Sequence, residues 1–238
     1  MWYFKENVKR DLYHYFNCIP KTFKYIDNQK IYFFYNHDKI LDFVNQFKLN
    51  NDLIPIKMEI EQLPTYSISD YYLNSCKNQD VKLAQSLNKG NEKIVNHYLR
   101  DYIEGSETCY RNLFTIWTSK IFLIKKILEE EKNNNKLYAW FDISISRFFN
   151  NRDNWNVLEN DYDKNFFYHY DSFMNYLGNK INLNASFMLS NINNWKIIIE
   201  TFNEYLEKEK NNNLAHDEET LISLFYNKYN FFRKLNNF

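Results

Sequence analysis

The residue of this sequence whose chemistry stands out first is Asp142. It directly follows Leu137–Phe141, a run of five apolar residues typical of a strand that is buried on both faces of a parallel sheet. Ligands of open α/β sheets bind beyond the carboxyl ends of the strands, and a carboxylate there needs a cation or hydrogen-bond donors. Asp142 is therefore a candidate ligand of a divalent metal that binds a phosphate-bearing substrate. The alternative is that Asp142 caps the following turn or pairs with Arg147.

Lys120 is the second candidate, because it interrupts the apolar stripe of a predicted helix over residues 113–130, between Ile116 and Ile124. A lysine in such a stripe either extends its ammonium group to solvent or places it on an anion. A phosphate group as that anion would make Lys120 part of a binding site.

The run His216-Asp217-Glu218-Glu219 opens the last predicted helix and is the third candidate. Acidic side chains in a first helical turn satisfy free amides and interact with the helix dipole by about 0.3–1 kcal/mol each, which explains the acids without any function. His216 is not explained in this way, and it is either a metal ligand or an isolated exposed histidine. The other histidines show no spacing that predicts a metal site: His14, His37, His97 and His169.

Composition argues against several classes of protein. Three glycines in 238 residues provide no Walker-type loop and no G-x-G-x-x-G motif, and G-x-S-x-G is also absent, so P-loop chemistry and hydride transfer are excluded. Lys+Arg and Asp+Glu both number 30. This balance argues against nucleic-acid binding, which normally needs a basic excess or a basic face. Three widely spaced cysteines form neither a disulfide framework nor a zinc motif.

The chain also lacks the features of a membrane or exported protein. It has no run of about 18 apolar residues, so we expect no transmembrane segment. Its first 12 residues carry charges throughout, which is not the pattern of a signal peptide. We therefore expect a cytoplasmic protein with reduced thiols. With neither an internal repeat nor a long linker, residues 1–238 are predicted to form one domain.

The remaining pattern predicts strands that alternate with helices. Strands are expected over residues 31–35, 53–60, 137–141 and 181–189. Helices are expected over residues 5–17, 40–47, 113–130 and 195–206, and from residue 221 on. Asp38 is expected to cap the second helix, and Asn193 or Asn194 the helix that follows them. Residues 67–110 are expected to hold helices and loops, and the asparagine tracts 133–135 and 211–213 to be loops. This alternation predicts an α/β sandwich with a mostly parallel central sheet flanked by helices.

Several segments together resemble the HtrL/YibB glycosyltransferase-like family. Residues 140–148 (WFDISISRF) are similar to its W-x-D-x-G-I-x-[RK]-[FV] segment, and residues 117–120 (WTSK) to its Ser-Lys-containing helix. Residues 31–36 (IYFFYN) and 60–66 (IEQLPTY) resemble its N-terminal half. Residues 184–188 (NASFM), with Asn194-Trp195 after them, resemble the N-A-G-x-x-x…W segment of GT-A transferases, and Asp217-Glu218 stands where the family has a D-E or D-Q pair.

The resemblance implies a GT-A fold, the fold of nucleotide-diphospho-sugar transferases. It implies transfer of a sugar from a nucleotide-sugar donor to a glycan, lipid or protein acceptor, with Mn²⁺ or Mg²⁺ as a Lewis acid on the donor diphosphate. The metal ligands that it implies are Asp142, Ser144 and His216. The donor-binding residues are Lys120, Asn184, Ala185 and Ser186. The residues at the sugar or the reacting carbon are Asp217 and Glu218.

The sequence departs from the family pattern in three places. Ser144 stands where the family has glycine and many GT-A enzymes have aspartate, and a hydroxyl is a weaker metal ligand than a carboxylate. Ser186 replaces the glycine of N-A-G. Only residues 1–4 precede the first predicted helix, so the first strand of the fold is expected to be short or missing. These departures support an alternative function, a GT-A-fold binding module without turnover. A third hypothesis is an interaction protein whose exposed tyrosines bind a partner.

Overall fold

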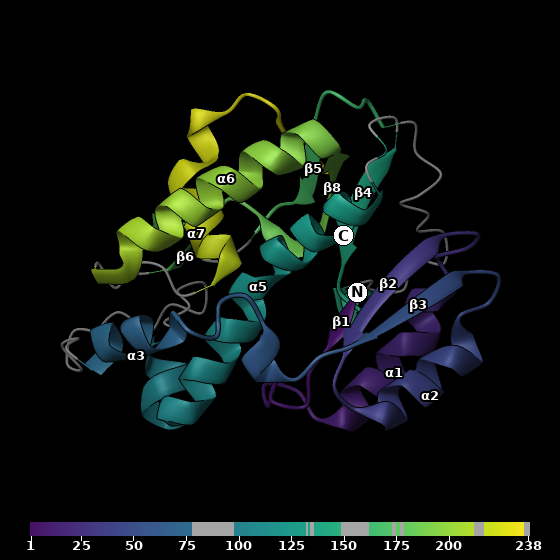
Figure 1. The fold of residues 1–238 in the computed structure, drawn as a ribbon, viewed down its shortest axis with the longest axis horizontal. Coiled ribbons are helices and arrows are strands. Elements are labelled where there is room, and N and C mark those ends of the chain that lie inside the picture. The colour runs from purple at the N-terminus through teal and green to yellow at the C-terminus, as the bar shows by residue number, and fades with distance from the viewer. Residues whose placement is uncertain are drawn as a thin grey trace.

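The first part of the chain forms a three-stranded parallel sheet that two helices cover on one face. In this computed structural model β1 (Trp2–Tyr3), β2 (Lys30–Tyr35) and β3 (Asp52–Lys57) lie side by side in that order. α1 (Leu12–Phe23) and α2 (Asp38–Phe47) make the two crossover connections and pack against each other (Figure 1). β2 is buried on both of its faces, which explains its unbroken apolar sequence.

The second part of the chain forms a mixed sheet of four strands. β4 (Leu137–Phe141), β5 (Phe167–Tyr170), β8 (Asn184–Asn191) and β9 (Phe232–Leu235) lie in the order β4-β8-β5-β9. β8 runs antiparallel to both of its neighbours, whereas β5 and β9 are parallel. A small hairpin is formed by β6 (Asn175–Tyr176) and β7 (Asn179–Lys180).

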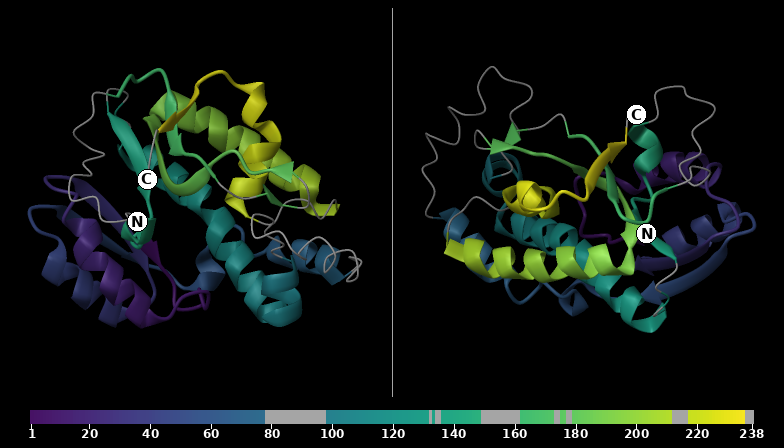
Figure 2. Two further views of the ribbon diagram at one scale, coloured as in Figure 1. Left: turned by 180° about the vertical axis from the view of Figure 1, so that it is seen from behind. Right: turned by 90° about the horizontal axis from the view of Figure 1, so that it is seen from above.

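Three helices pack on the second sheet or on one another beside it. α5 (Glu107–Glu131) and α6 (Ile192–Lys208) pack against each other along one face of this sheet, and α7 (Glu218–Phe225) packs on both of them (Figure 2). The rings of Phe167 in β5 and Trp195 in α6 lie 4.8 Å apart, and the Trp195 indole donates a hydrogen bond to the Tyr138 carbonyl of β4 (2.9 Å). These contacts fix α6 on the sheet, and α5 packs against α6 with Lys120 among its buried residues.

The structure describes residues 1–77, 98–131, 133, 136–148, 162–172, 175–176, 179–211 and 217–235. Shorter elements in these ranges are α3 (Ser69–Lys77), a π-helical segment (Tyr98–Glu104) and 3₁₀ turns at Ile60–Gln62, Ile145–Phe148, Glu209–Asn211 and Tyr226–Lys228. None of the helices in the described ranges has the length and apolar character needed to cross a membrane. The prediction of helices and loops over residues 67–110 falls partly on residues 78–97, which lie outside these ranges, as do most residues of the two asparagine tracts.

Several predicted boundaries are wrong, and side-chain caps explain two of the differences. The first helix begins at Leu12, because the Asp11 side chain accepts from the His14 amide (2.7 Å) and acts as the N-cap, and it continues through Pro20 to Phe23. Asp38 is the first residue of α2 and not its cap. The second predicted strand ends at Lys57 and not at residue 60. The cap of α6 is Asn191, whose side chain accepts from the Asn194 amide (2.8 Å), so neither Asn193 nor Asn194 has that role.

The α/β class is confirmed, but the sheet differs from the prediction. The strands form two larger sheets, and β4 pairs antiparallel with β8. The strand Leu137–Phe141 is also only half buried, since Ala139 is exposed and Leu137 and Tyr138 are partly exposed. A short apolar run shows the same sequence pattern in a parallel and in an antiparallel strand, so its neighbour could not be inferred. The first strand is present with only two residues.

Candidate functional site

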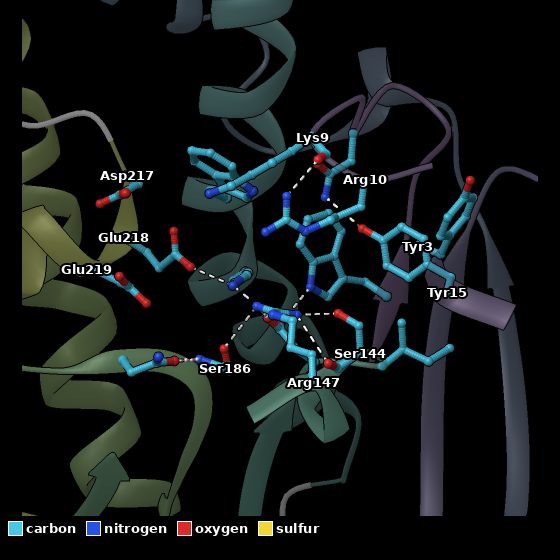
Figure 3. Close-up of a pocket in the computed structure, with 17 residues that line it drawn as sticks. Tyr3, Lys9, Arg10, Tyr15, Ser144, Arg147, Ser186, Asp217, Glu218 and Glu219 are labelled. Carbon is cyan, nitrogen blue, oxygen red and sulfur yellow. Dashed lines mark hydrogen bonds and ion pairs between the residues drawn. The ribbon is translucent and has the colours of Figure 1, made fainter. Parts of the chain in front are cut away.

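A pocket of about 310 Å³ opens where the carboxyl ends of β1 and β4 meet (Figure 3). β1 is an edge strand of the sheet β1-β2-β3, and β4 is an edge strand of the sheet β4-β8-β5-β9, so the edges of the two sheets come together at this point. Ligands of α/β proteins bind in crevices beyond the carboxyl ends of strands. The rings of Trp2 and Trp140 lie 6.3 Å apart at the base of the crevice, where the two sheets approach each other.

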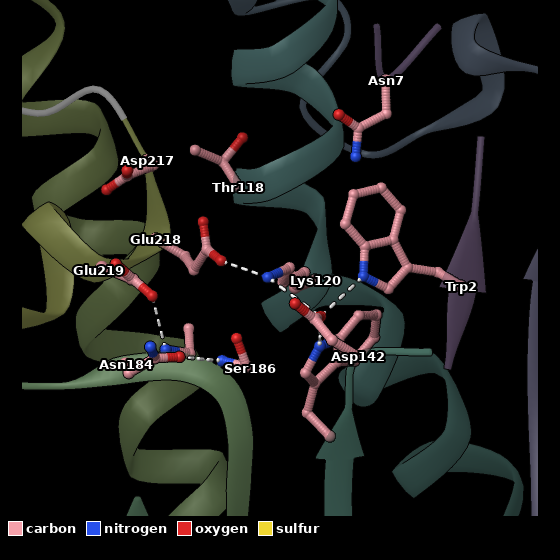
Figure 4. Close-up of polar contacts among 12 residues, drawn as sticks. Trp2, Asn7, Thr118, Lys120, Asp142, Asn184, Ser186, Asp217, Glu218 and Glu219 are labelled. Carbon is pink, nitrogen blue, oxygen red and sulfur yellow. Dashed lines mark hydrogen bonds and ion pairs between the residues drawn. The ribbon is translucent and has the colours of Figure 1, made fainter. Parts of the chain in front are cut away.

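Asp142 lies at the base of this pocket as the first residue after β4. Its Oδ1 accepts hydrogen bonds from the indole N–H groups of Trp2 (3.1 Å; Figure 4) and Trp140 (3.0 Å). Its backbone amide donates to the Ser186 carbonyl (2.8 Å) and thereby continues the contact between β4 and β8. Burial disfavours the carboxylate, but Lys120, Arg147 and the two indoles outweigh burial and hold the pKa of Asp142 below its usual value.

Lys120 reaches the same carboxylate from α5. Its Nζ lies 3.3 Å from Asp142 Oδ1 and 2.6 Å from Glu218 Oε1, and only 5% of its side chain is exposed. Lys120 therefore neither extends to solvent nor faces an open anion site, because two carboxylates of the protein already surround its ammonium group. Burial lowers the pKa of Lys120, but the attraction of these carboxylates outweighs burial and raises the pKa above its usual value.

The acidic run at the start of α7 divides into three different roles. Asp217 caps the helix, since its Oδ1 accepts from the Thr220 amide (2.9 Å) and the Thr220 hydroxyl bonds back. Glu218 pairs with Lys120, and Glu219 Oε1 accepts from the Ala185 amide of β8 (2.7 Å). Burial and the neighbouring acids raise the pKa values of Glu218 and Glu219. These two effects outweigh the attraction of the Lys120 ammonium group, which lowers both pKa values.

The role of Asp217 as a cap gives a first testable prediction. Asp217→Ala should lower the free energy of unfolding by about 1 kcal/mol, because an amide of the first turn loses its acceptor. Asp217→Asn keeps a side-chain oxygen and should lower the free energy of unfolding by only a few tenths of the loss expected for Asp217→Ala. Urea unfolding of the two variants beside the unchanged protein measures the difference. If the alanine and asparagine variants are equally stable, the side chain of Asp217 does not stabilise α7.

The predicted donor-binding residues of β8 lie at the pocket with one exception. Asn184 and Ser186 line it, and Asn184 Oδ1 accepts from the Ser186 amide (2.9 Å). Ala185 points away from the pocket into the core and is fully buried, so it contributes only its backbone amide. Ser144 also lines the pocket, and its hydroxyl accepts a hydrogen bond from the Arg147 guanidinium.

Several pocket residues were not among the predicted site residues. Lys9 and Arg10 follow β1, and Lys9 Nζ lies 4.7 Å from the centre of the Trp117 ring. Tyr3 and Tyr15 form an aromatic wall with ring centres 4.8 Å apart. Asp142 directly follows its strand, whereas Lys9 and Arg10 come six and seven residues after β1, so position after a strand does not single them out. No motif marks them, which is why they were missed.

Charges of both signs are balanced around the pocket. Four acidic and four basic side chains line it: Asp142, Asp217, Glu218 and Glu219, and Lys9, Arg10, Lys120 and Arg147. The acids of α7 occupy one wall, Lys9 and Arg10 lie at one end, and Arg147 lies at the other (Figure 3). Acidic, basic and aromatic side chains therefore line separate parts of the pocket, and each part suits a ligand group of a different kind.

The described residues at Asp142 do not fit a divalent cation. Asp142 Oδ1 already accepts from two indoles and pairs with Lys120, and Oδ2 lies 3.7 Å from Arg147 Nη2. A metal ion here would meet two positive side chains, and each unit of like charge at 4 Å costs about 4 kcal/mol in a partly buried site. Within the described part of the chain, no group of three His, Cys, Asp or Glu side chains could hold a metal. His216, the third predicted ligand, lies outside the described residues, so the predicted metal set remains a prediction.

Comparisons with known proteins provide no family assignment. The chain matches no family model, and the comparisons with curated proteins and with solved structures also give no match. The function is therefore inferred from the pocket and from the resemblance of short segments.

Proposed function

We propose that this pocket binds a nucleotide-sugar donor and that the protein transfers the sugar to a hydroxyl group of an acceptor in a GT-A-like fold. The observation that supports this best is the division of the pocket into an acidic wall, an aromatic wall and basic ends, beyond the carboxyl ends of β1 and β4. A nucleotide sugar carries sugar hydroxyls, an aromatic base and a diphosphate, so each part finds a wall of matching chemistry.

The side chains of α7 suit the sugar end of such a ligand. Carboxylates accept hydrogen bonds from hydroxyl groups, and Glu218 and Glu219 both line the pocket beside Asn184 and Ser186 of β8. In the transfer, the acceptor oxygen forms a bond to the anomeric carbon while the bond from this carbon to the diphosphate breaks. The diphosphate leaves with the bonding electrons, and the acceptor proton passes to a base. Glu218 and Glu219 are the groups that we assign to that end of the reaction, with Asp217 holding the helix that presents them.

A thermal-shift screen tests the proposal. UDP, GDP, CMP and their sugars are each added with Mn²⁺ and, separately, with EDTA. A ligand at 100 times its dissociation constant should stabilise the fold by about 2.7 kcal/mol. For a chain of this length that corresponds to about 5–10 °C in the melting temperature. The nucleotide that gives the shift is then supplied as its sugar, and release of the leaving nucleotide (UDP, GDP or CMP) is measured. No shift with any of these ligands would reject the proposal.

A binding module without turnover is the second candidate, and one observation favours it. The ammonium group of Lys120 binds both Asp142 and Glu218 inside the protein, so two of the predicted reacting or metal-binding carboxylates are already paired. Asp142 is the clearer case, because its pKa lies below the usual value and it is therefore a weaker base than a free carboxylate. A clear thermal shift with a nucleotide sugar, without release of the nucleoside diphosphate under any condition, would support this candidate over the transferase.

A further inference from the structure

We propose that the site holds the diphosphate of its ligand directly on basic side chains, Arg147 from the end of β4 with Lys9 and Arg10 from the end of β1, and that this binding needs no divalent cation. The inference rests on the proposed function, since it concerns the same pocket and the same class of ligand. It differs from what the glycosyltransferase resemblance implies, which is a metal ion on the diphosphate.

The surroundings of Asp142 supply the first reason. Its two carboxylate oxygens face positive side chains of the protein, Oδ1 toward Lys120 at 3.3 Å and Oδ2 toward Arg147 at 3.7 Å. The position that a metal would occupy beside this carboxylate is thus the position that Arg147 approaches. The chemistry expected of the metal, positive charge next to the leaving phosphate, is available from the guanidinium in the same place.

Arg147 is also held in a defined position. It donates to the hydroxyl and, at 3.3 Å, to the carbonyl of Ser144, and its Nη2 lies 3.5 Å from the Ser186 hydroxyl. The guanidinium thus lies across the ends of β4 and β8 at one end of the pocket (Figure 3). A guanidinium presents its N–H groups in a planar fork that matches two phosphate oxygens, and holding the fork in place lowers the entropy lost on binding.

Lys9 and Arg10 provide positive charge at the opposite end of the pocket. Lys9 Nζ lies over the Trp117 ring. The Arg10 guanidinium donates a hydrogen bond to the Lys9 carbonyl (3.0 Å), and Figure 3 shows the two side chains at the same end of the pocket. A diphosphate between the two ends would meet basic groups from the segments that follow β1 and β4. Lys120 is not assigned to the diphosphate, because it is only 5% exposed and pairs with Asp142 and Glu218.

The experiment compares binding of two probes, inorganic pyrophosphate and the nucleoside diphosphate selected by the thermal-shift screen, by isothermal titration calorimetry. Titrations are made in EDTA and, for the nucleotide, also in Mn²⁺. The variants are Arg147→Met, Arg147→Lys and Arg10→Met. The matched control is Arg233→Met, which removes an arginine of β9 that does not line the pocket. Circular dichroism and melting temperature confirm that each variant is folded, and Arg10→Met changes an exposed side chain and keeps the test valid if Arg147→Met fails to fold.

The expected result is that the nucleotide binds in EDTA with a dissociation constant within about twofold of that in Mn²⁺. Arg147→Met and Arg10→Met should each weaken both probes by about tenfold or more, Arg147→Lys should weaken them less than Arg147→Met, and Arg233→Met should have no effect. Binding that requires Mn²⁺ would overturn this inference and leave the proposed function intact. Binding in EDTA that Arg147→Met and Arg10→Met leave unchanged would also overturn it. No binding of any nucleotide or nucleotide sugar in either condition would reject the proposed function itself, and this inference with it.

Discussion

Lys120→Met should lower the free energy of unfolding by about 3–5 kcal/mol, the effect expected when one partner of a buried ion pair is removed. The variant leaves the Asp142 and Glu218 carboxylates buried without the ammonium group that lies 3.3 and 2.6 Å from them. For a chain of this length, the melting temperature should fall by about 6–20 °C. Urea and thermal unfolding, followed by circular dichroism, measure both quantities.

A matched control for this variant lies on the same helix. Lys125 is a residue of α5 whose side chain is 54% exposed and whose Nζ is 4.0 Å from Glu129, so Lys125→Met should cost less than about 1 kcal/mol. The double variant Lys120→Met/Glu218→Gln removes one of the two stranded charges and should be more stable than Lys120→Met alone. If Lys120→Met is as stable as the Lys125→Met control, the ion pairs of Lys120 do not support the fold.

Asp142→Ala should destabilise the protein by about 2–6 kcal/mol, because the buried indole N–H groups of Trp2 and Trp140 both lose their acceptor. Each buried donor without a partner costs about 1–3 kcal/mol. Asp142→Asn keeps an oxygen in the same place and removes only the charge. Its loss of unfolding free energy should therefore be less than half of the loss in Asp142→Ala. Urea unfolding followed by tryptophan fluorescence is the natural measurement, since both donors are tryptophans. Equal losses in the two variants would show that the charge, and not the acceptor, is what matters.

Asp142 supports the fold and also lines the pocket, and both roles affect binding measurements on its variants. If Asp142 were only a metal ligand, Asp142→Ala would remove ligand binding without affecting the fold. In the structure the carboxylate also joins Trp2 of the first sheet to Trp140 of the second, so the alanine variant alters the base of the pocket as well as its charge. Asp142→Asn is therefore the variant to use in binding experiments.

The elements with strong periodicity could be predicted, but the way in which they pair could not. The strands near residues 31–35 and 137–141 and the helix over residues 113–130 correspond to β2, β4 and α5. The antiparallel partner of β4 depends on contacts with residues 187–191, and a short apolar run contains no information about direction. The start of α1 was placed too early, because the hydrophobic spacing extends beyond the hydrogen bond of the Asp11 cap.

The candidate site was predicted in part, for a similar reason. Asp142 was found from its position after an apolar strand, and the pocket does lie there. Lys120 was singled out because it interrupts an apolar stripe, but its partners lie 22 and 98 positions away along the chain and no local pattern indicates them. Arg10 stands in a short charged segment that resembles any exposed loop. Only its place after β1 in three dimensions brings it to the pocket.

The pocket takes residues from nearly the whole described length of the chain, from Trp2 in β1 to Glu219 in α7. Contacts between such distant residues form late, because the intervening chain must be ordered first. During synthesis, Lys120 and Asp142 leave the ribosome well before Glu218 does. A nascent chain that lacks α7 therefore has Lys120 and Asp142 but not Glu218. The capacity to bind a ligand should arise only when α7 packs against α5 and α6. If the pocket binds a nucleotide, this binding would report the completion of folding, and proteolytic fragments without α7 should not bind it even where their first sheet is intact.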